Sequence, residues 1–383
     1  MRVTRLKLKN WKNFKQVEVA LDQRAFFVGP NASGKSNLLD ALRFVRDLAA
    51  TVGGGLQEAV GSRGGIAQLR CFAATRNANI AIELVLGDDE APERWRYSLE
   101  FATDKGRDRP VVVKEQVFDY KRGELICDRP DDDDASDSAR LSETALEQVS
   151  ANKRFRPIAD FVASISYLHV VPQIIRDPKR WVGRDDPFGG DLIERMNSTS
   201  KRTRDARLKR MEAALQLAVP QFRDLQLEVD TKGMPHLRAN YTHWRPQGAW
   251  QRQDRFSDGT LRLLGLIWAL QEPGGPLLLE EPEMSLNPAV VSRLAPMIAR
   301  ATNRSRRQVL ITTHSVDLLA TDVALSEVHL LEASEQGTSI LSEPELKDVR
   351  RLVDGGVPLG EAILPRARAK DVERLPLLEL MQQ

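Results

Sequence analysis

Residues 29–36 read GPNASGKS and match the pattern G-x-x-x-x-G-K-[ST] at every fixed position. This pattern constrains the fold more than any other part of the chain, because it binds phosphate only between a buried strand and a helix. The apolar run at 25–28 directly before it suits a strand that is buried on both faces. Helical spacing follows in Leu38, Leu42, Val45 and Leu48. The sequence therefore predicts a strand, a glycine loop and a helix in that order.

The residue types in this loop indicate phosphate binding. Glycines let backbone N–H groups curl around phosphate oxygens, and the following helix directs the positive end of its dipole at them. Lys35 supplies a positive charge near the terminal phosphates, and the Ser36 hydroxyl can ligate Mg²⁺. The predicted nucleotide contacts come from Gly29, Asn31, Ala32, Ser33, Gly34, Lys35 and Ser36. The alternative is a loop that merely joins strand to helix, and the matching elements on either side disfavour it.

Two later apolar runs end in polar residues, as parallel strands do when they carry ligand groups at their carboxyl ends. Residues 277–283 read LLLEEPE, so Glu280 and Glu281 follow a predicted strand. One carboxylate there can hold Mg²⁺ through water, and its neighbour can orient or deprotonate an attacking water. Residues 309–311 lead in the same way to His314, whose imidazole can hydrogen-bond a terminal phosphate. The alternatives are a solvated strand end for the acids and a structural hydrogen bond for the histidine.

Residues 256–260, FSDGT, precede an amphipathic helical pattern in Leu261, Leu264, Ile267 and Leu270. Taken alone, the segment is a helix N-terminus with Ser257 or Asp258 as its cap. Its position in the sequence, between the glycine loop and the acidic strand, also allows a functional interpretation, which depends on the family resemblance described next.

With these pieces in order, the chain resembles the ABC-type ATPases of the RecF/SMC/OLD group. It is most similar to the small bacterial members found in anti-phage and two-gene defence systems. The likeness covers residues 1–100 and 245–350, and the middle more loosely. It implies an α/β fold, an ABC-type ATPase head of the P-loop NTPase class. Such a head has a mixed sheet and a parallel core sheet, here with an inserted α+β and helical region.

The resemblance also implies residue roles. In this group two heads sandwich two ATP molecules head to tail, so Ser257 and Gly259 would contact the γ-phosphate bound to a second subunit. Glu280 would hold Mg²⁺, Glu281 would be the catalytic base, and His314 would be the switch histidine. Residues 285–288 match the loop that crosses the dimer interface. We therefore expect ATP and Mg²⁺ as cofactors, ATP hydrolysis, and a homodimer or higher homo-oligomer.

The sequence departs from the family pattern at three points. The second position of the signature is Asp258 rather than glycine, and the magnesium carboxylate is Glu280 rather than the commoner aspartate. Gln68 is a weak candidate for the metal-sensing glutamine. These departures are compatible with ATP binding and predict slow turnover.

Four segments are predicted along the chain. Residues 1–100 form the first part of the head, 101–244 an inserted lid or arm, 245–350 the second part of the head, and 351–383 a C-terminal tail. Within the insertion, 128–144 is acidic and is expected to be an exposed loop, whereas 201–215 is a basic helix. Because no sustained heptad pattern occurs, a long coiled-coil arm is excluded.

Composition bears on the binding partners and the cellular location of the protein. The formal net charge of +2 argues neither for nor against nucleic acid. The two cysteines, Cys71 and Cys127, are too few for a disulfide framework and suit a reducing cytoplasmic location. No apolar run approaches the length of a membrane span, so we expect no membrane domain.

Three functions remain open. The first is an ATP-gated switch that acts on a separate effector, a nuclease or toxin, in defence or DNA metabolism. The second is a RecF-like repair factor that binds DNA directly, for which the basic stretch 201–210 could track phosphates. The third is a scaffold that binds ATP without hydrolysing it. The 69 residues after His314 (383 minus 314) contain no Asp-x-Asp pair of the kind that relatives with a fused nuclease carry, which favours a separate effector.

Overall fold

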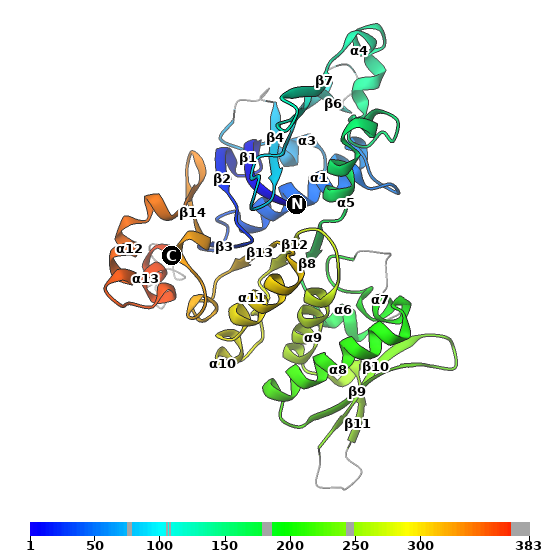
Figure 1. The fold of residues 1–383 in the computed structure, drawn as a ribbon, viewed down its shortest axis with the longest axis vertical. Helices are drawn as coiled ribbons and strands as arrows, with labels where there is room; N and C mark the ends of the chain where they lie inside the picture. The colour runs from blue at the N-terminus through cyan, green and yellow to red at the C-terminus, as the bar shows by residue number, and fades with distance from the viewer. Residues whose placement is uncertain (75–78, 105, 107–108, 178–185, 243–248, 369–383) are drawn as a thin grey trace, which may run out of the picture.

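The computed structural model describes residues 1–74, 79–104, 106, 109–177, 186–242 and 249–368. Its described strands form three sheets, two of them in the body of the molecule and a small one at the lower right of Figure 1. The first sheet is antiparallel, with the order β2-β1-β4-β5-β6-β7. Its strands are β1 (Arg2–Trp11), β2 (Phe14–Ala20), β4 (Ile80–Gly87), β5 (Trp95–Asp104), β6 (Arg109–Asp119) and β7 (Glu124–Arg129).

The second sheet is the core of the molecule, with the order β15-β14-β3-β13-β12-β8. All its neighbouring strands run parallel except β15, which pairs antiparallel with β14. They are β3 (Arg24–Val28), β8 (Ser166–Leu168), β12 (Leu277–Glu280), β13 (Val309–Thr313), β14 (Val328–Ser334) and β15 (Gly337–Leu341). The three strands predicted from apolar runs, β3, β12 and β13, are therefore adjacent in one sheet, and the expected α/β fold is confirmed.

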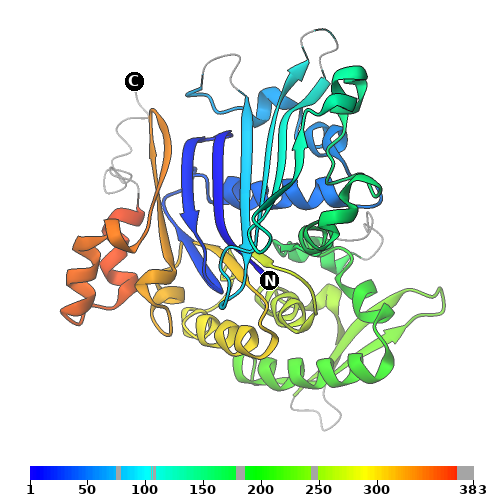
Figure 2. The same cartoon turned by 45° about the horizontal axis from the view of Figure 1, so that its top comes forward.

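Both faces of the core sheet are covered, which explains why its strands read as unbroken apolar runs. Ala25 and Phe27 of β3 pack toward the first sheet and helix α1 (Lys35–Ala49). Phe26 and Val28 point the other way, into a second core formed with the helices on the opposite face. Figure 2 shows α1 lying against the strands of the first sheet. The helix therefore lies between the two sheets, and the loop before it is held from both sides.

The second core is closed by α8 (Lys201–Ala218), α9 (Asp258–Gln271) and α11 (Leu294–Ser305). Helix α8 packs on the third, antiparallel sheet, whose strands are β9 (Phe222–Val229), β10 (Pro235–Tyr241) and β11 (Ala249–Arg252). The remaining α-helices are α2 (Leu56–Gly61), α3 (Ile66–Leu69), α4 (Asp132–Ser136), α5 (Arg156–Ala163), α6 (Pro172–Arg176), α7 (Leu192–Ser198), α10 (Pro288–Val291), α12 (Lys347–Asp354) and α13 (Leu359–Ala367). The 3-10 turns are η1 (Ser138–Ser142), η2 (Ala151–Phe155), η4 (Gln253–Arg255), η5 (Asp317–Leu319), η6 (Leu325–Glu327) and η7 (Glu343–Glu345).

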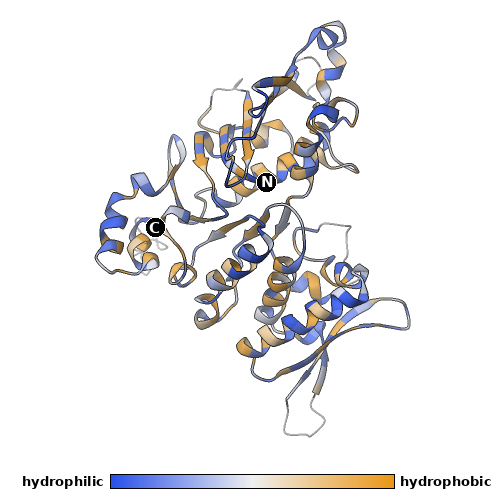
Figure 3. Ribbon diagram, in the orientation of Figure 1, coloured by the Kyte–Doolittle hydropathy of each residue, from blue (hydrophilic) through white to orange (hydrophobic). Residues whose placement is uncertain are grey.

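The distribution of hydrophobic and hydrophilic residues agrees with this arrangement of sheets and helices. In Figure 3 apolar residues are frequent on the central strands, whereas α12 at the left is mostly hydrophilic. No helix in the described part of the chain has the length and apolar character needed to cross a bilayer.

The predicted segment 101–244 does not form a body apart from the sheets. Strands β6 and β7 extend the first sheet, and β8 is the edge strand of the core sheet beside β12. The predicted boundaries at 100 and 244 therefore do not coincide with sheet boundaries. Only the part from α6 to β11 lies as a unit on one side of the core sheet (Figure 1).

The segment 128–144 is mostly exposed, as expected, but it is ordered by α4 and η1 rather than being a loop throughout. Arg129 lies buried and donates to both oxygens of Asp134, at 2.9 and 2.8 Å, and to Glu115 at 3.3 Å. Asp134 also accepts from the backbone of Asp131 and completes a capping box at the start of α4. A buried arginine thus offsets the local negative charge and orders the segment, which composition alone does not reveal.

Candidate nucleotide-binding site

The glycine loop, residues 29–36, connects the end of β3 to the start of α1, as predicted. At two positions of the loop a residue larger than glycine would clash with neighbouring atoms. Gly34 has φ +99°, and a Cβ there would lie 1.9 Å from the Asn13 amide nitrogen. A Cβ on Gly29 would approach the carbonyl oxygen of Leu331 to 2.6 Å. Close packing from the turn between β1 and β2 and from β14 therefore requires glycine at both fixed positions of the loop.

Lys35 is buried at the first position of α1, and its ammonium group donates to the carbonyl oxygens of Gly29 and Pro30, both at 2.9 Å. Burial lowers the pKa of Lys35 to about 8, while Glu281, Glu280 and Glu283 act in the opposite direction. The ammonium group thus lies inside the loop, close to three carboxylates. Within the loop the buried Ser33 hydroxyl has no hydrogen-bond partner among the described residues, whereas Asn31 and Ala32 are exposed.

Ser36 and Glu280 meet across the loop. The Ser36 hydroxyl donates to one carboxylate oxygen of Glu280 at 2.5 Å, and the Tyr167 hydroxyl donates to the other. Burial, followed by the charge of Glu280, raises the pKa of Tyr167. Arg43 of α1 lies over the Tyr167 ring, 4.1 Å from its centroid. Tyr167 comes from β8, and no feature of the sequence pointed to it.

Glu281 and His314, two residues predicted for this site, form its second contact. His314 Nε2 lies 2.8 Å from Glu281 Oε1. The hydrogen bond from His314 lowers the pKa of Glu281, and the charge of Lys35 adds to the effect while burial opposes it. Glu281 adopts φ +45°, an uncommon backbone conformation for glutamate, and its N–H donates to the Thr312 carbonyl at 3.0 Å. A backbone hydrogen bond therefore joins the ends of β12 and β13 beside the contact between the two side chains.

The signature residues lie apart from this group. Ser257 caps α9 by accepting the Thr260 N–H at 3.2 Å. The prediction that this segment is a capped helix N-terminus is therefore confirmed. A Cβ on Gly259 would approach the carbonyl oxygen of Ser285 to 2.8 Å, which places the loop 285–288 against the signature. Among the described residues no hydrogen bond or ion pair joins Ser257 to Lys35 or Ser36.

The remaining predicted residue is not brought to the site. Gln68 lies exposed on α3, and no hydrogen bond within the described ranges connects it with Ser36 or Glu280. No group of three or more His, Cys, Asp or Glu side chains in the described part of the chain could hold a metal ion by itself. A magnesium ion would instead be held by the Ser36 hydroxyl, Glu280 and nucleotide oxygens, a ligand set that fits its preference for oxygen. The glycine cradle, the buried lysine and the unpartnered Ser33 hydroxyl fit the phosphates of a nucleotide.

Residues 24–320 match the family described as "AAA domain, putative AbiEii toxin, Type IV TA system". The chain belongs to this family. No sequence among the curated proteins matched it.

Solved structures of SMC heads share the fold of this AAA-domain chain. An SMC head bound to the C-winged helix domain of ScpA is 16% identical, with 90% of this chain and 98% of that one covered and a TM-score of 0.56. The Smc head with a coiled coil and joint from Pyrococcus yayanosii is 13% identical, with 93% and 99% covered and a TM-score of 0.52. The family and the fold together confirm the predicted resemblance: the chain is an AAA domain with the fold of SMC heads, a P-loop NTPase fold of the ABC type.

A third glutamate of this AAA domain, Glu283, has a role that the sequence reading missed. It is 9% exposed, and its Oε1 accepts the Thr313 hydroxyl at 2.5 Å and the His314 N–H at 3.1 Å. Its other oxygen is buried without a hydrogen-bond partner among the described residues, and burial raises its pKa. Glu283 thus fixes the backbone of His314 from the loop after β12. The acidic run 280–283 was visible in the sequence, but which of its members turned inward was not.

We predict that Glu283→Ala lowers the free energy of unfolding by about 1–3 kcal/mol, because the buried Thr313 hydroxyl and the partly buried His314 N–H lose their acceptor. Glu283→Gln keeps the accepting oxygen and has no charge to bury. A carboxyl whose pKa is raised by folding loses stability as pH rises from its unfolded value of 4.5 toward the folded one. The stability of Glu283→Gln relative to wild type should therefore increase over that pH range in urea unfolding followed by tryptophan fluorescence. Equal losses for the alanine and glutamine variants at every pH would contradict this role.

Proposed function

We propose that the chain binds and hydrolyses ATP, and that it acts as a dimeric nucleotide-gated switch for a separate effector in anti-phage defence or DNA metabolism. The observation that carries the proposal is the meeting of Ser36, Glu280, Glu281 and His314 beside the glycine loop. These groups come from three adjacent strand ends of a parallel sheet, where ligands of such sheets bind.

Each residue of the site has a separate proposed role in binding or hydrolysis. Lys35 would leave the carbonyls of Gly29 and Pro30 for the phosphate oxygens, which are better acceptors because they are charged. Ser36 and Glu280 would hold Mg²⁺, which neutralises charge on the phosphates. Glu281 would accept a proton from the attacking water, and its lowered pKa keeps it ionised for that purpose. His314, at 2.8 Å from Glu281, would orient that carboxylate and reach the terminal phosphate.

A second copy of the chain completes the proposed site. Gly259 lies against the chain's own loop 285–288, and Ser257 caps α9, so neither residue contacts the phosphate loop of its own chain through a hydrogen bond among the described residues. The N-terminus of α9 offers free backbone N–H groups and a positive dipole end, which suit a phosphate bound to another subunit. Head-to-tail pairing of two chains would use both features.

The family description supports a paired partner. It names a putative toxin of a type IV TA system, and the word toxin there describes the matched domain itself. A second component of such a system is compatible with a separate partner, whereas the identity of that partner as a nuclease or toxin is our own proposal. The switch would act on it by changing shape, since nucleotide binding favours one conformation over another.

Direct DNA binding is the second candidate, and α8 is the element that bears on it. Arg207 is buried, 5.0 Å from the centroid of the Trp268 ring, and Arg210 donates to Gln271 at 2.7 Å. These contacts give two of the basic residues a structural role. Lys201, Arg202 and Lys209 are exposed and could meet phosphates. Salt-dependent DNA binding would favour this candidate, and absence of ATP turnover would favour a non-hydrolysing scaffold.

Nucleotide binding and hydrolysis are tested with two variants. Lys35→Ala should weaken ATP binding roughly 10- to 100-fold in calorimetric titration, because the phosphates lose a charged donor. The exposed Lys114→Ala is the matched control and should bind as wild type does. Glu281→Gln should bind ATP normally and hydrolyse it roughly 100-fold more slowly or worse. Normal turnover by Glu281→Gln together with loss in Glu280→Gln would mean that the two carboxylates have the opposite roles.

Pairing of the heads is tested separately. Glu281→Gln should show an ATP-stabilised head–head contact when it is sized with and without Mg-ATP. Ser257→Arg introduced into that variant should weaken the contact, because a bulky side chain would occupy the place of the phosphate. Ser136→Arg on the exposed part of α4 serves as the control. Identical chemical cross-linking across the heads with and without nucleotide would refute nucleotide-gated pairing.

A further inference from the structure

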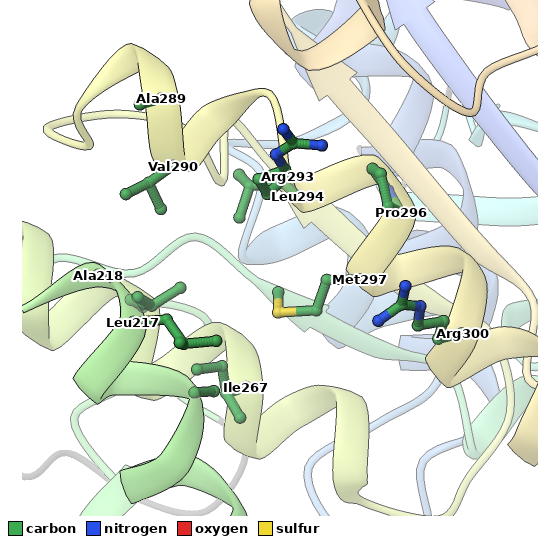
Figure 4. A pocket seen from close by; sticks show the side chains of 12 residues that line it. Leu217, Ala218, Ile267, Ala289, Val290, Arg293, Leu294, Pro296, Met297 and Arg300 are labelled. Carbon is green, nitrogen blue, oxygen red and sulfur yellow. The ribbon is translucent and has the colours of Figure 1, made fainter.

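A groove of about 570 Å³ opens between four helices on the side of the core sheet away from α1 (Figure 4). Helix α9 forms its floor, the end of α8 one wall, and α10 with α11 the other. Met297 projects from α11 toward Leu217 and Ile267 (Figure 4). The lining residues are Ala214, Leu217, Ala218, Leu263, Ile267, Ala289, Val290, Arg293, Leu294, Pro296, Met297 and Arg300.

The groove combines an apolar interior with a positive edge. Leu217 at its lip is 89% exposed, an unusual state for a leucine beside an apolar cavity. Arg293, directly before α11, and Arg300 on α11 are both exposed and lie about one helical turn on either side of Met297. No ion pair joins either arginine to a carboxylate in the described ranges. The occupant that fits is therefore a segment rich in leucine that also carries acidic side chains.

The last residues of the chain have this composition. Residues 369–383 read AKDVERLPLLELMQQ and lie outside the described residues. Their apolar side chains are concentrated in Leu375, Leu377, Leu378, Leu380 and Met381. Their acidic residues are Asp371, Glu373 and Glu379, which outnumber the two basic residues, Lys370 and Arg374.

The starting point of this segment allows it to reach the groove. Helix α13 precedes it and packs against η5, which also packs against α10 and α11 of the groove wall. Fifteen residues can span about 50 Å when extended. One helix is only about 10–12 Å across. The segment can therefore pass around α11 and still lie along the groove.

We propose that residues 369–383 dock in the groove of their own chain, with leucine side chains between α8 and α11 and acidic side chains beside Arg293 and Arg300. This inference does not depend on ATP hydrolysis. Three other arrangements compete with it. A second copy or a separate protein could fill the groove, or the segment could lie on the exposed Leu352 and Leu364 of α12 and α13, which are closer to where it begins.

A cysteine pair in the full-length chain distinguishes these arrangements. Met297→Cys with Leu378→Cys should form a disulfide within one chain under mild oxidation, because such a bond needs Cα atoms within about 7 Å. Leu352→Cys with Leu378→Cys is the matched control and should link at least fivefold less. Cys127 is replaced by serine in both, and Cys71 is buried. Linking between two chains, or preferential linking to position 352, would overturn the proposal.

Limited digestion with trypsin gives a second readout that needs no oxidation. Cleavage after Lys370 and Arg374 should be at least fivefold faster in Leu217→Asp and in Arg293→Glu/Arg300→Glu than in wild type. The substituted side chains are exposed, so the variants should keep the wild-type circular dichroism spectrum. Leu352→Asp should be cut at the wild-type rate. Equal rates in all four proteins, or acceleration only in Leu352→Asp, would show that the segment does not occupy the groove.

Discussion

The structure depends on how it accommodates Glu280, Glu281 and Glu283 around one buried lysine. Like charges at such close quarters repel, and burial adds to the cost. Each carboxylate has its own stabilising partner. These are the hydroxyls of Ser36 and Tyr167 for Glu280, the imidazole of His314 for Glu281, and the Thr313 hydroxyl for Glu283. Lys35 is attracted to all three, which offsets part of the loss from its own burial. The strand order β3-β13-β12 is what allows one lysine to serve three acids.

A second set of contacts holds the glycine loop itself in place. The Asn13 amide donates to the Ser33 carbonyl at 3.0 Å and to the Thr338 hydroxyl at 2.6 Å, and Thr338 donates to the same carbonyl at 2.9 Å. Asn13 lies in the tight turn between β1 and β2, and Thr338 lies on β15. Two hairpins that are far apart in the sequence therefore support the loop from outside. This support explains how the loop keeps its shape with left-handed conformations at Ala32 and Gly34.

The parts of the site that could be predicted are those whose signal is local. The glycine loop, the strand ends at Glu281 and the cap at Ser257 each follow from a few consecutive residues. Tyr167 and Glu283 could not be predicted in the same way, because their roles depend on which strands are neighbours and which way a loop turns. The ordered structure around Asp134 could not be predicted for the same reason. Its partner Arg129 stands in the sequence as one basic residue among many acids.

The carboxylate at the second position of the signature illustrates how such a departure can be accommodated. A negative charge at Asp258 would repel a phosphate approaching the N-terminus of α9. Arg176 donates to Asp258 at 2.5 Å and to the Phe256 carbonyl at 2.8 Å, and it does so through one nitrogen. The positive charge, which is delocalised over the whole guanidinium group, offsets the charge of Asp258 beside the signature. Arg176 ends α6, so the pair also links the region between β8 and β9 to the start of α9. A movement of that region that separated Arg176 from Asp258 would therefore change the local charge at the N-terminus of α9.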